Sequence, residues 1–140
     1  MSKAEIDLFS ELEIKVQFYD LDPMSVVWHG NYFRYFEEAR CALLDRIQYN
    51  YLEMRDSGYA WPIVDARIKF IRPLVFGQRV RVRATLEEYE TRLKIGYEIR
   101  NGEGVILTRG STIQVAVDMA TEELCFTSPP ILIERVTGCS

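Results

Sequence analysis

Cysteine and histidine are both scarce in this chain of 140 residues. Its three cysteines, Cys41, Cys125 and Cys139, are odd in number, widely spaced and form no CxxC pair. Such a set is typical of free thiols in a reducing compartment, and it favours a cytoplasmic protein. His29 is the only histidine. Without a second histidine or paired cysteines, the sequence predicts no zinc site.

Long apolar runs and phosphate-binding motifs are absent as well. No run approaches the roughly 18 apolar residues that span a bilayer, and residues 1–15 lack the apolar core of a secretory signal. The absence of GxSxG, GxGxxG and Walker-type motifs argues against a serine-hydrolase elbow and the common nucleotide-binding loops. A net charge of −4 argues against a general nucleic-acid binder. We therefore expect neither a membrane protein nor a nucleic-acid-binding protein.

Apolar residues, by contrast, are plentiful. They make up 48% of the chain, which is enough for a sizeable core. The sequence has no internal repeat, low-complexity tract or linker, so its length predicts one domain over residues 1–140.

The pattern of apolar residues predicts one helix and several strands. Most of the candidate strands alternate apolar and polar residues, and they cover residues 12–18, 63–71, 80–86, 93–99 and 105–117. From Tyr32 to about Arg55 there is no Gly or Pro, the apolar residues have helical spacing, and Asn31 is a suitable N-cap. The order of one strand, a long helix and four strands predicts an α+β fold, with the helix packed on an antiparallel sheet.

Residues 20–40, DLDPMSVVWHGNYFRYFEEAR, place two carboxylates and the histidine just before the predicted helix. An oriented carboxylate such as Asp22 can attack a carbonyl carbon or activate a water molecule. The free N–H groups at the helix start, residues 31–34, can stabilise a developing oxyanion. The alternative is that Asp20 and Asp22 are turn residues and that His29 is structural, and spacing alone favours this alternative.

A second informative stretch, RIKFIRPLVFGQRVRVR over residues 67–83, contains no acid. It holds six of the seventeen basic residues, namely Arg67, Lys69, Arg72, Arg79, Arg81 and Arg83. Such a patch can bind a phosphorylated ligand, for example a nucleotide-bearing carrier. The alternative is a solvated outer sheet face with salt bridges to acids such as Glu87 and Glu88. The charge pattern does not choose between these two interpretations.

These motifs resemble a known family. The run Asp20-Leu21-Asp22-Pro23, followed by VVWHGNY at residues 26–32 and FEEAR at residues 36–40, resembles the 4-hydroxybenzoyl-CoA thioesterase family of hotdog-fold acyl-CoA thioesterases, including its bacterial YbgC-like branch. A commoner match is FIRPL at residues 70–74 with Gly77, although here Gln78 takes the place of the acid that often follows. The resemblance covers roughly residues 10–120.

The resemblance implies a hotdog fold, in which a curved antiparallel sheet of about five strands wraps around one central helix. It implies hydrolysis of an acyl-CoA thioester to a free acid and CoA, with no cofactor. Members of the family pair their sheets edge to edge, so a homodimer or homotetramer with active sites between subunits is expected.

The resemblance also assigns roles to residues. It implies that Asp22 is the nucleophile or the general base, and that backbone amides near Asn31 and Tyr32 polarise the thioester carbonyl. His29 lies in the same loop and matches the YbgC-like branch, whereas some members acting on aromatic CoA esters differ there. Phosphates of CoA suit the basic stretch, where the candidates are Arg67, Lys69, Arg72, Arg79 and Arg81.

Three alternatives to an acyl-CoA thioesterase follow from the same residues. An acyl-carrier-protein thioesterase is one, since an acidic carrier can dock on the basic stretch. A non-catalytic protein that binds acyl-CoA or acyl carriers is another, although the Asp22 motif argues against it. A hotdog dehydratase or hydratase needs a histidine and a carboxylate that meet across the site, and the position of the single histidine makes this the weaker alternative.

Overall fold

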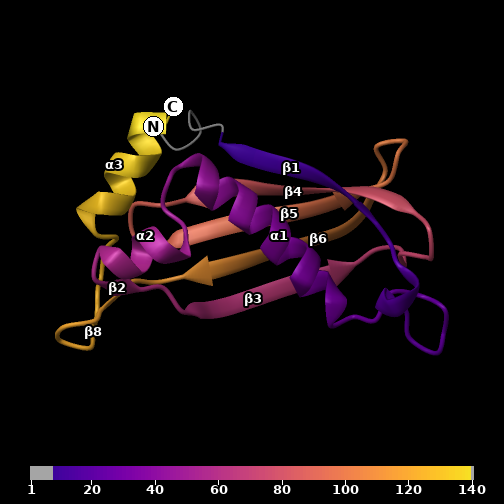
Figure 1. Ribbon diagram of the computed structural model, residues 1–140, viewed down its shortest axis with the longest axis horizontal. Coiled ribbons are helices and arrows are strands. Elements are labelled where there is room, and N and C mark those ends of the chain that lie inside the picture. Colours follow the sequence, from indigo (N-terminus) through magenta and orange to yellow (C-terminus); the bar gives the residue numbers. More distant parts are fainter. Residues whose placement is uncertain (1–7, 140) are drawn as a thin grey trace.

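The computed structural model describes residues 8–139, and its main feature is a five-stranded antiparallel sheet in the order β1-β4-β5-β6-β3. The strands are β1 Phe9–Lys15, β3 Ile63–Phe70, β4 Arg79–Glu88, β5 Leu93–Arg100 and β6 Ile106–Gln114. Helix α1, Asn31–Arg46, lies across one face of this sheet (Figure 1). The predicted α+β hotdog arrangement is therefore confirmed.

The core lies between α1 and the sheet. Because successive side chains of a strand point to opposite faces, only every second residue of β4 and β5 faces the helix. These inward residues are buried, and they include Val80, Val82, Ala84, Leu93, Ile95, Tyr97 and Ile99. From α1, the ring of Phe36 stacks on that of Tyr97 with 4.4 Å between centroids. The opposite face of the sheet is left to the charged residues of the same strands.

The predicted helix from Tyr32 to about Arg55 is wrong in one respect, because it is broken into α1 and α2, Tyr51–Asp56. Gln48 has a positive φ of 58°, which a continuous helix does not allow. Asn50 then caps α2 with a capping box. The side chain of Asn50 accepts the N–H of Tyr51 at 2.8 Å, and the side chain of Glu53 accepts the backbone N–H of Asn50 at 2.9 Å.

The first strand lies about three residues earlier than the predicted 12–18. After Lys15 the ladder ends with Val16, whose N–H donates to the carbonyl of Gln78 at 2.9 Å. The chain then turns into a short 3-10 helix, η2 Phe18–Asp20. The apolar alternation continues through Phe18 although the strand does not, so the periodicity overran the end of the strand.

Several short elements have no counterpart in the sequence prediction. A second sheet in the order β2-β7-β8 is built from Tyr59–Ala60, Val117–Asp118 and Glu123–Leu124. Helix α3, Pro130–Cys139, lies beside the end of the main sheet near α2 (Figure 1), and its Leu132 and Val136 are buried. Two-residue strands are too short to show a periodicity. Among residues 8–139, no helix is long and apolar enough to cross a membrane.

Candidate active site

The carboxylate of Asp20 is buried at the start of the loop that leads to α1, and only 2% of the residue is exposed. It accepts the N–H of Gln17 at 2.9 Å and the phenol of Tyr35 at 2.8 Å, and it forms an ion pair with Arg34. A buried carboxylate is costly unless it is paired and hydrogen-bonded in this way. Asp20 is thus more than a turn residue, because its carboxylate fastens the loop to α1.

The backbone carbonyl of Asp20 fixes the other end of the same loop. It accepts the N–H of Trp28 at 2.9 Å and the side-chain amide of Asn31 at 2.9 Å. Next to it, the N–H of Val27 donates to the carbonyl of Leu74 at 2.9 Å. The loop over residues 21–30 is therefore held to both α1 and the segment before β4, and the Asn31 side chain serves as one of these ties.

Asp22 lies in this loop and is half-buried. Its Oδ1 accepts the N–H of Met24 at 2.8 Å, and its own N–H donates to the carbonyl of Val26 at 2.9 Å. These contacts form an Asx turn that orients the carboxylate. A cleft of about 270 Å³ opens beside it, lined by Asp22, Val26, Val27, His29, Tyr32, Phe70, Ile71, Arg72 and Pro73. The structure thus brings together four of the predicted site residues: Asp22, His29, Tyr32 and Arg72.

The walls of the cleft are aromatic. Tyr32 is buried, and its ring meets that of Phe70 edge to face with 4.9 Å between centroids. Burial raises the pKa of the Tyr32 phenol, so the side chain stays neutral and forms a wall. The imidazole of His29 is exposed and contacts the ring of Trp28, with 5.2 Å between centroids.

The amides predicted to polarise a carbonyl, those of Asn31 and Tyr32, are already occupied. The Asn31 N–H donates to the carbonyl of Trp28 at 2.9 Å, and the Tyr32 N–H donates to that of His29 at 3.3 Å. Gly30 already has helical backbone angles, so the helical hydrogen bonding begins earlier than the sequence suggests. Over residues 8–139, the N–H groups of His29 and Gly30 have no acceptor. These two N–H groups are therefore free donors next to the start of α1.

The basic stretch does not form one surface at the cleft. Arg79, Arg81 and Arg83 lie on the face of the sheet opposite α1, where they are paired with acids of β1. The N···O distances are 3.0 Å from Arg79 to Glu13, 3.6 Å from Arg81 to Glu11 and 3.1 Å from Arg83 to Glu11. The prediction that Arg79 and Arg81 bind CoA is thus not supported. These arginines instead form an ion-paired outer sheet face, which was the alternative interpretation. Their partners are Glu11 and Glu13 and not the expected Glu87 and Glu88.

Arg67 and Lys69 are also directed away from α1. Their neighbour Ile68 pairs with Gly110, which faces α1, so the residues on either side of it point to the opposite face. Arg67 contacts Asp65 at 3.3 Å. Only Arg72 of the five predicted CoA ligands lines the cleft. In the part of the chain that the structure describes, neither Arg72 nor Lys69 has an ion-pair partner.

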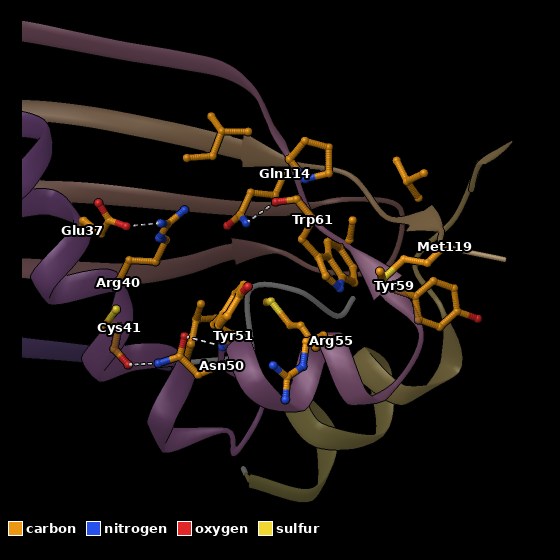
Figure 2. Close-up of a pocket in the computed structure, with 16 residues that line it drawn as sticks. Glu37, Arg40, Cys41, Asn50, Tyr51, Arg55, Tyr59, Trp61, Gln114 and Met119 are labelled. Carbon is orange, nitrogen blue, oxygen red and sulfur yellow. Dashed lines mark hydrogen bonds and ion pairs between the residues drawn. The ribbon is translucent and has the colours of Figure 1, made fainter. Parts of the chain in front are cut away.

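A larger cavity of about 750 Å³ lies farther along α1 and was missed from the sequence. Figure 2 shows its polar residues Arg40 and Gln114, which project toward one another from α1 and β6. In the sequence, Ile113 and Val115 alternate as apolar residues, and the polar Gln114 between them is expected on the opposite, solvent-facing side although it is buried. A polar residue between two apolar ones at the end of the strand was the available signal.

Comparisons with known proteins identify relatives of this chain. The sequence profile of the thioesterase-like superfamily matches residues 16–134. The chain is 31% identical over 110 residues to the "Putative acyl-CoA thioesterase YneP" of Bacillus subtilis (strain 168), which covers 78% of this chain and 80% of that protein. It is 30% identical over 116 residues to the 1,4-dihydroxy-2-naphthoyl-CoA hydrolase of Thermosynechococcus vestitus, with 81% of this chain and 73% of that protein covered.

Solved structures show the same fold. The crystal structure of a DHNA-CoA thioesterase from Staphylococcus aureus superposes with a TM-score of 0.75 and 28% identity, over 84% of this chain and 80% of that one. The family match over residues 16–134 includes α1 and the strands β3, β4, β5 and β6, so the similarity is not confined to the loop motif.

Proposed function

Because this chain belongs to the thioesterase-like superfamily, we propose that it hydrolyses an acyl-CoA thioester to a free carboxylic acid and CoA. The observation that carries the proposal is the cleft beside the start of α1. There an oriented carboxylate, Asp22, lies with His29, whose backbone N–H has no acceptor within residues 8–139, and with Arg72, a cation that has no ion-pair partner within those residues. A carboxylate, free amides and a cation correspond to the three groups of the substrate: carbonyl carbon, carbonyl oxygen and CoA phosphates.

In the proposed reaction the thioester carbon lies next to Asp22. The carboxylate takes a proton from water, the water oxygen bonds to the carbonyl carbon, the C–S bond breaks and the thiolate leaves. Alternatively, a carboxylate oxygen of Asp22 bonds to the carbonyl carbon, the C–S bond breaks as the thiolate leaves, and water then hydrolyses the resulting anhydride to the free acid and the original carboxylate. Thiolates are good leaving groups, so neither route needs a strong general acid. Single turnover in ¹⁸O-water detects the second route when water attacks Cγ of Asp22 in the anhydride, because that hydrolysis leaves ¹⁸O in the carboxylate.

The start of α1 supplies the electrophilic assistance. The N–H groups of His29 and Gly30 lie at the positive end of the helix dipole, where negative charge on the carbonyl oxygen is stabilised. The imidazole of His29 is exposed at the same cleft and is placed to orient the substrate or to hydrogen-bond to the attacking carboxylate.

The part of the substrate that carries the acyl group, either CoA or a carrier protein, is expected to lie beside Arg72. Its guanidinium suits the phosphates of CoA, and the same cation at the mouth of the cleft suits the phosphopantetheine arm of an acidic carrier protein. The test is to assay the purified protein with matched acyl-CoA and acyl-carrier-protein esters while detecting released thiol. Turnover of the CoA esters supports the proposal. Turnover of carrier-protein esters alone assigns the other substrate, and binding without turnover overturns the enzymatic assignment.

We also propose that two copies pair through β3. It is an edge strand of the sheet, and on it Ile63, Val64 and Phe70 are exposed. Exposed apolar edges are otherwise an aggregation hazard. Light scattering on a size-exclusion column tests this, since Val64→Lys is expected to convert a dimer or tetramer to smaller species.

A further inference from the structure

The 750 Å³ cavity lies between α1, α2 and the ends of β3 and β6 (Figure 2). Most of its wall is apolar or aromatic, and the main contributors are Leu44, Met54, Tyr59, Trp61, Ile63 and Met119. Its size lies within the range of small-molecule sites, about 300–1,000 Å³. A cavity of this character suits the apolar body of an acyl group.

One end of the cavity is polar. Among the polar residues at this end, Gln114 is the most buried, with 5% of the residue exposed. The side-chain N–H of Gln114 donates to the backbone carbonyl of Trp61 at 2.8 Å. Because a carbonyl can only accept, this bond fixes the orientation of the amide and directs Oε1 the other way. Among the described residues, Oε1 of Gln114 has no hydrogen-bond partner.

Arg40 forms the other side of the polar end. Its guanidinium pairs with Glu37 at 3.2 Å through one terminal nitrogen, while its Nε is buried and has no partner within residues 8–139. Figure 2 shows this guanidinium and the Gln114 amide on opposing walls. Arg40 and Glu37 also line a neighbouring cavity of about 200 Å³, whose wall includes Thr112. The pair thus lies where the two cavities meet.

These two unsatisfied atoms define the chemistry of a ligand. Oε1 of Gln114 needs a donor, and Nε–H of Arg40 needs an acceptor. A hydroxyl group is both. A carboxylate cannot donate, and an ammonium group cannot accept and is repelled by Arg40. Buried polar atoms without partners are costly, so a ligand that satisfies both is favoured over its deoxy analogue.

We infer that this cavity receives the acyl group of the substrate, and that Arg40 and Gln114 recognise a hydroxyl group on it. The inference rests on the proposed thioesterase function and names the substrate class. From Tyr32 at the catalytic cleft to Arg40 is about 12 Å along the helix axis, at 1.5 Å per residue. The hydroxyl therefore lies at the far end of the acyl group, on a medium-length chain or on a fused aromatic ring system.

The test compares substrates that differ only in this hydroxyl. One pair is 8-hydroxyoctanoyl-CoA and octanoyl-CoA, and the other is a hydroxynaphthoyl-CoA and naphthoyl-CoA. Comparing the two pairs shows whether the hydroxyl group is recognised on an alkyl chain or on an aromatic ring system. We expect kcat/KM to favour the hydroxylated member of at least one pair by tenfold or more. In Gln114→Met the ratio is expected to fall to within about twofold.

A second variant and a control keep the test independent of folding. Arg40→Lys retains a cation for Glu37 but lacks the donor at Nε, so it is expected to lower the same ratio. Met54→Leu alters the apolar wall without touching the polar end and leaves the ratio unchanged. Binding of the same esters to Asp22→Asn by calorimetry measures the preference without turnover.

The outcomes separate the two proposals. Turnover of all four esters with equal kcat/KM, unchanged in Gln114→Met, overturns the hydroxyl inference and leaves the thioesterase function standing; the polar end then holds only water. A preference in binding to Asp22→Asn, with no turnover by the native protein, supports the cavity assignment and overturns the proposed reaction.

Discussion

The phenol of Tyr35 donates a hydrogen bond of 2.8 Å to the carboxylate of Asp20, and the two residues are both buried. One comes from α1 and the other from the start of the loop that carries Asp22. Together with the ion pair to Arg34, this contact fixes the loop on α1, whose Tyr32 lines the cleft. Asp20 thereby positions Asp22 without lying in the cleft itself.

Removing this hydrogen bond is expected to lower stability. In Tyr35→Phe the buried carboxylate of Asp20 loses a donor, which we expect to cost about 1–3 kcal/mol in the free energy of unfolding. Urea denaturation followed by circular dichroism measures it. Tyr51→Phe is the matched control, because Tyr51 is 70% exposed and its loss of a hydroxyl is expected to have little effect. Equal stability of the two variants would contradict the positioning role.

The same contact predicts how stability depends on pH. Burial raises the pKa of Tyr35 well above its ordinary value of 10.0, and the hydrogen bond to Asp20 raises it further. Burial also raises the pKa of Tyr32 and of Tyr97. Between the unfolded and folded pKa values, the unfolded chain has released protons that the folded chain still holds. The free energy of unfolding is therefore constant with respect to these groups below pH 10 and falls as the pH rises beyond it.

Urea titrations at about pH 9, 10 and 11 test this dependence. Tyr35→Phe is expected to reduce the alkaline slope, because it removes one of the groups that bind a proton only in the folded state. A slope that is the same in the variant and the native protein would show that Tyr35 does not titrate as the structure implies.

A test of CoA binding can compare the ion-paired Arg79 with Arg72, which has no ion-pair partner in the described part of the chain. In Arg72→Ala we expect KM for an acyl-CoA to rise about threefold to tenfold, with a smaller effect at high salt, since a charge at the cleft mouth is lost. Arg79→Ala is expected to leave KM within about twofold, because its charge is held by Glu13 on the other face. A larger rise in KM for Arg79→Ala than for Arg72→Ala would contradict this and would indicate that CoA binds at β4.

The close approach of β6 to α1 depends on Gly110. A Cβ there would lie 2.5 Å from the side chain of Phe36 and 2.8 Å from the carbonyl oxygen of Arg67. Gly110→Ala is expected to displace Phe36 from Tyr97 and to destabilise the fold by about 1–3 kcal/mol. Gly102→Ala, at a turn with open space around it, serves as the control in the same thermal or urea melt. No difference between them would mean that the core can adjust.

The sequence predicted the sheet well and the loops less well, for physical reasons. Strands β4 and β5 alternate strictly because one face is core and the other is solvent, and their predicted bounds are correct to within two residues. The helix break escaped prediction because the positive φ at Gln48 has no Gly to signal it. The capping pattern of Asn50 and Glu53 was visible, however, and it marked a new helix start.

The candidate site shows a similar division. The local motif correctly placed Asp22 and His29 at one cleft, because both lie on the same short loop. The basic residues do not gather at one place, because strand register decides which acids the arginines of β4 meet, and register with β1 depends on residues nearly seventy positions away. The role of Asp20 also depends on Tyr35, a contact that spacing alone does not reveal.

The most direct measurement is the thioesterase activity of Asp22→Asn. An Asn oxygen can still accept the N–H of Met24, so the loop is expected to keep its turn while losing the carboxylate. Asp118→Asn is a close control, because Asp118 Oδ1 accepts the N–H of Ala120 at 2.9 Å in a similar turn outside the cleft.

We predict that kcat/KM for the best acyl-CoA falls by about 10²–10⁴-fold in Asp22→Asn, with unchanged stability, and stays within about twofold in Asp118→Asn. Full activity of a folded Asp22→Asn protein would contradict the assignment of this cleft as the catalytic site.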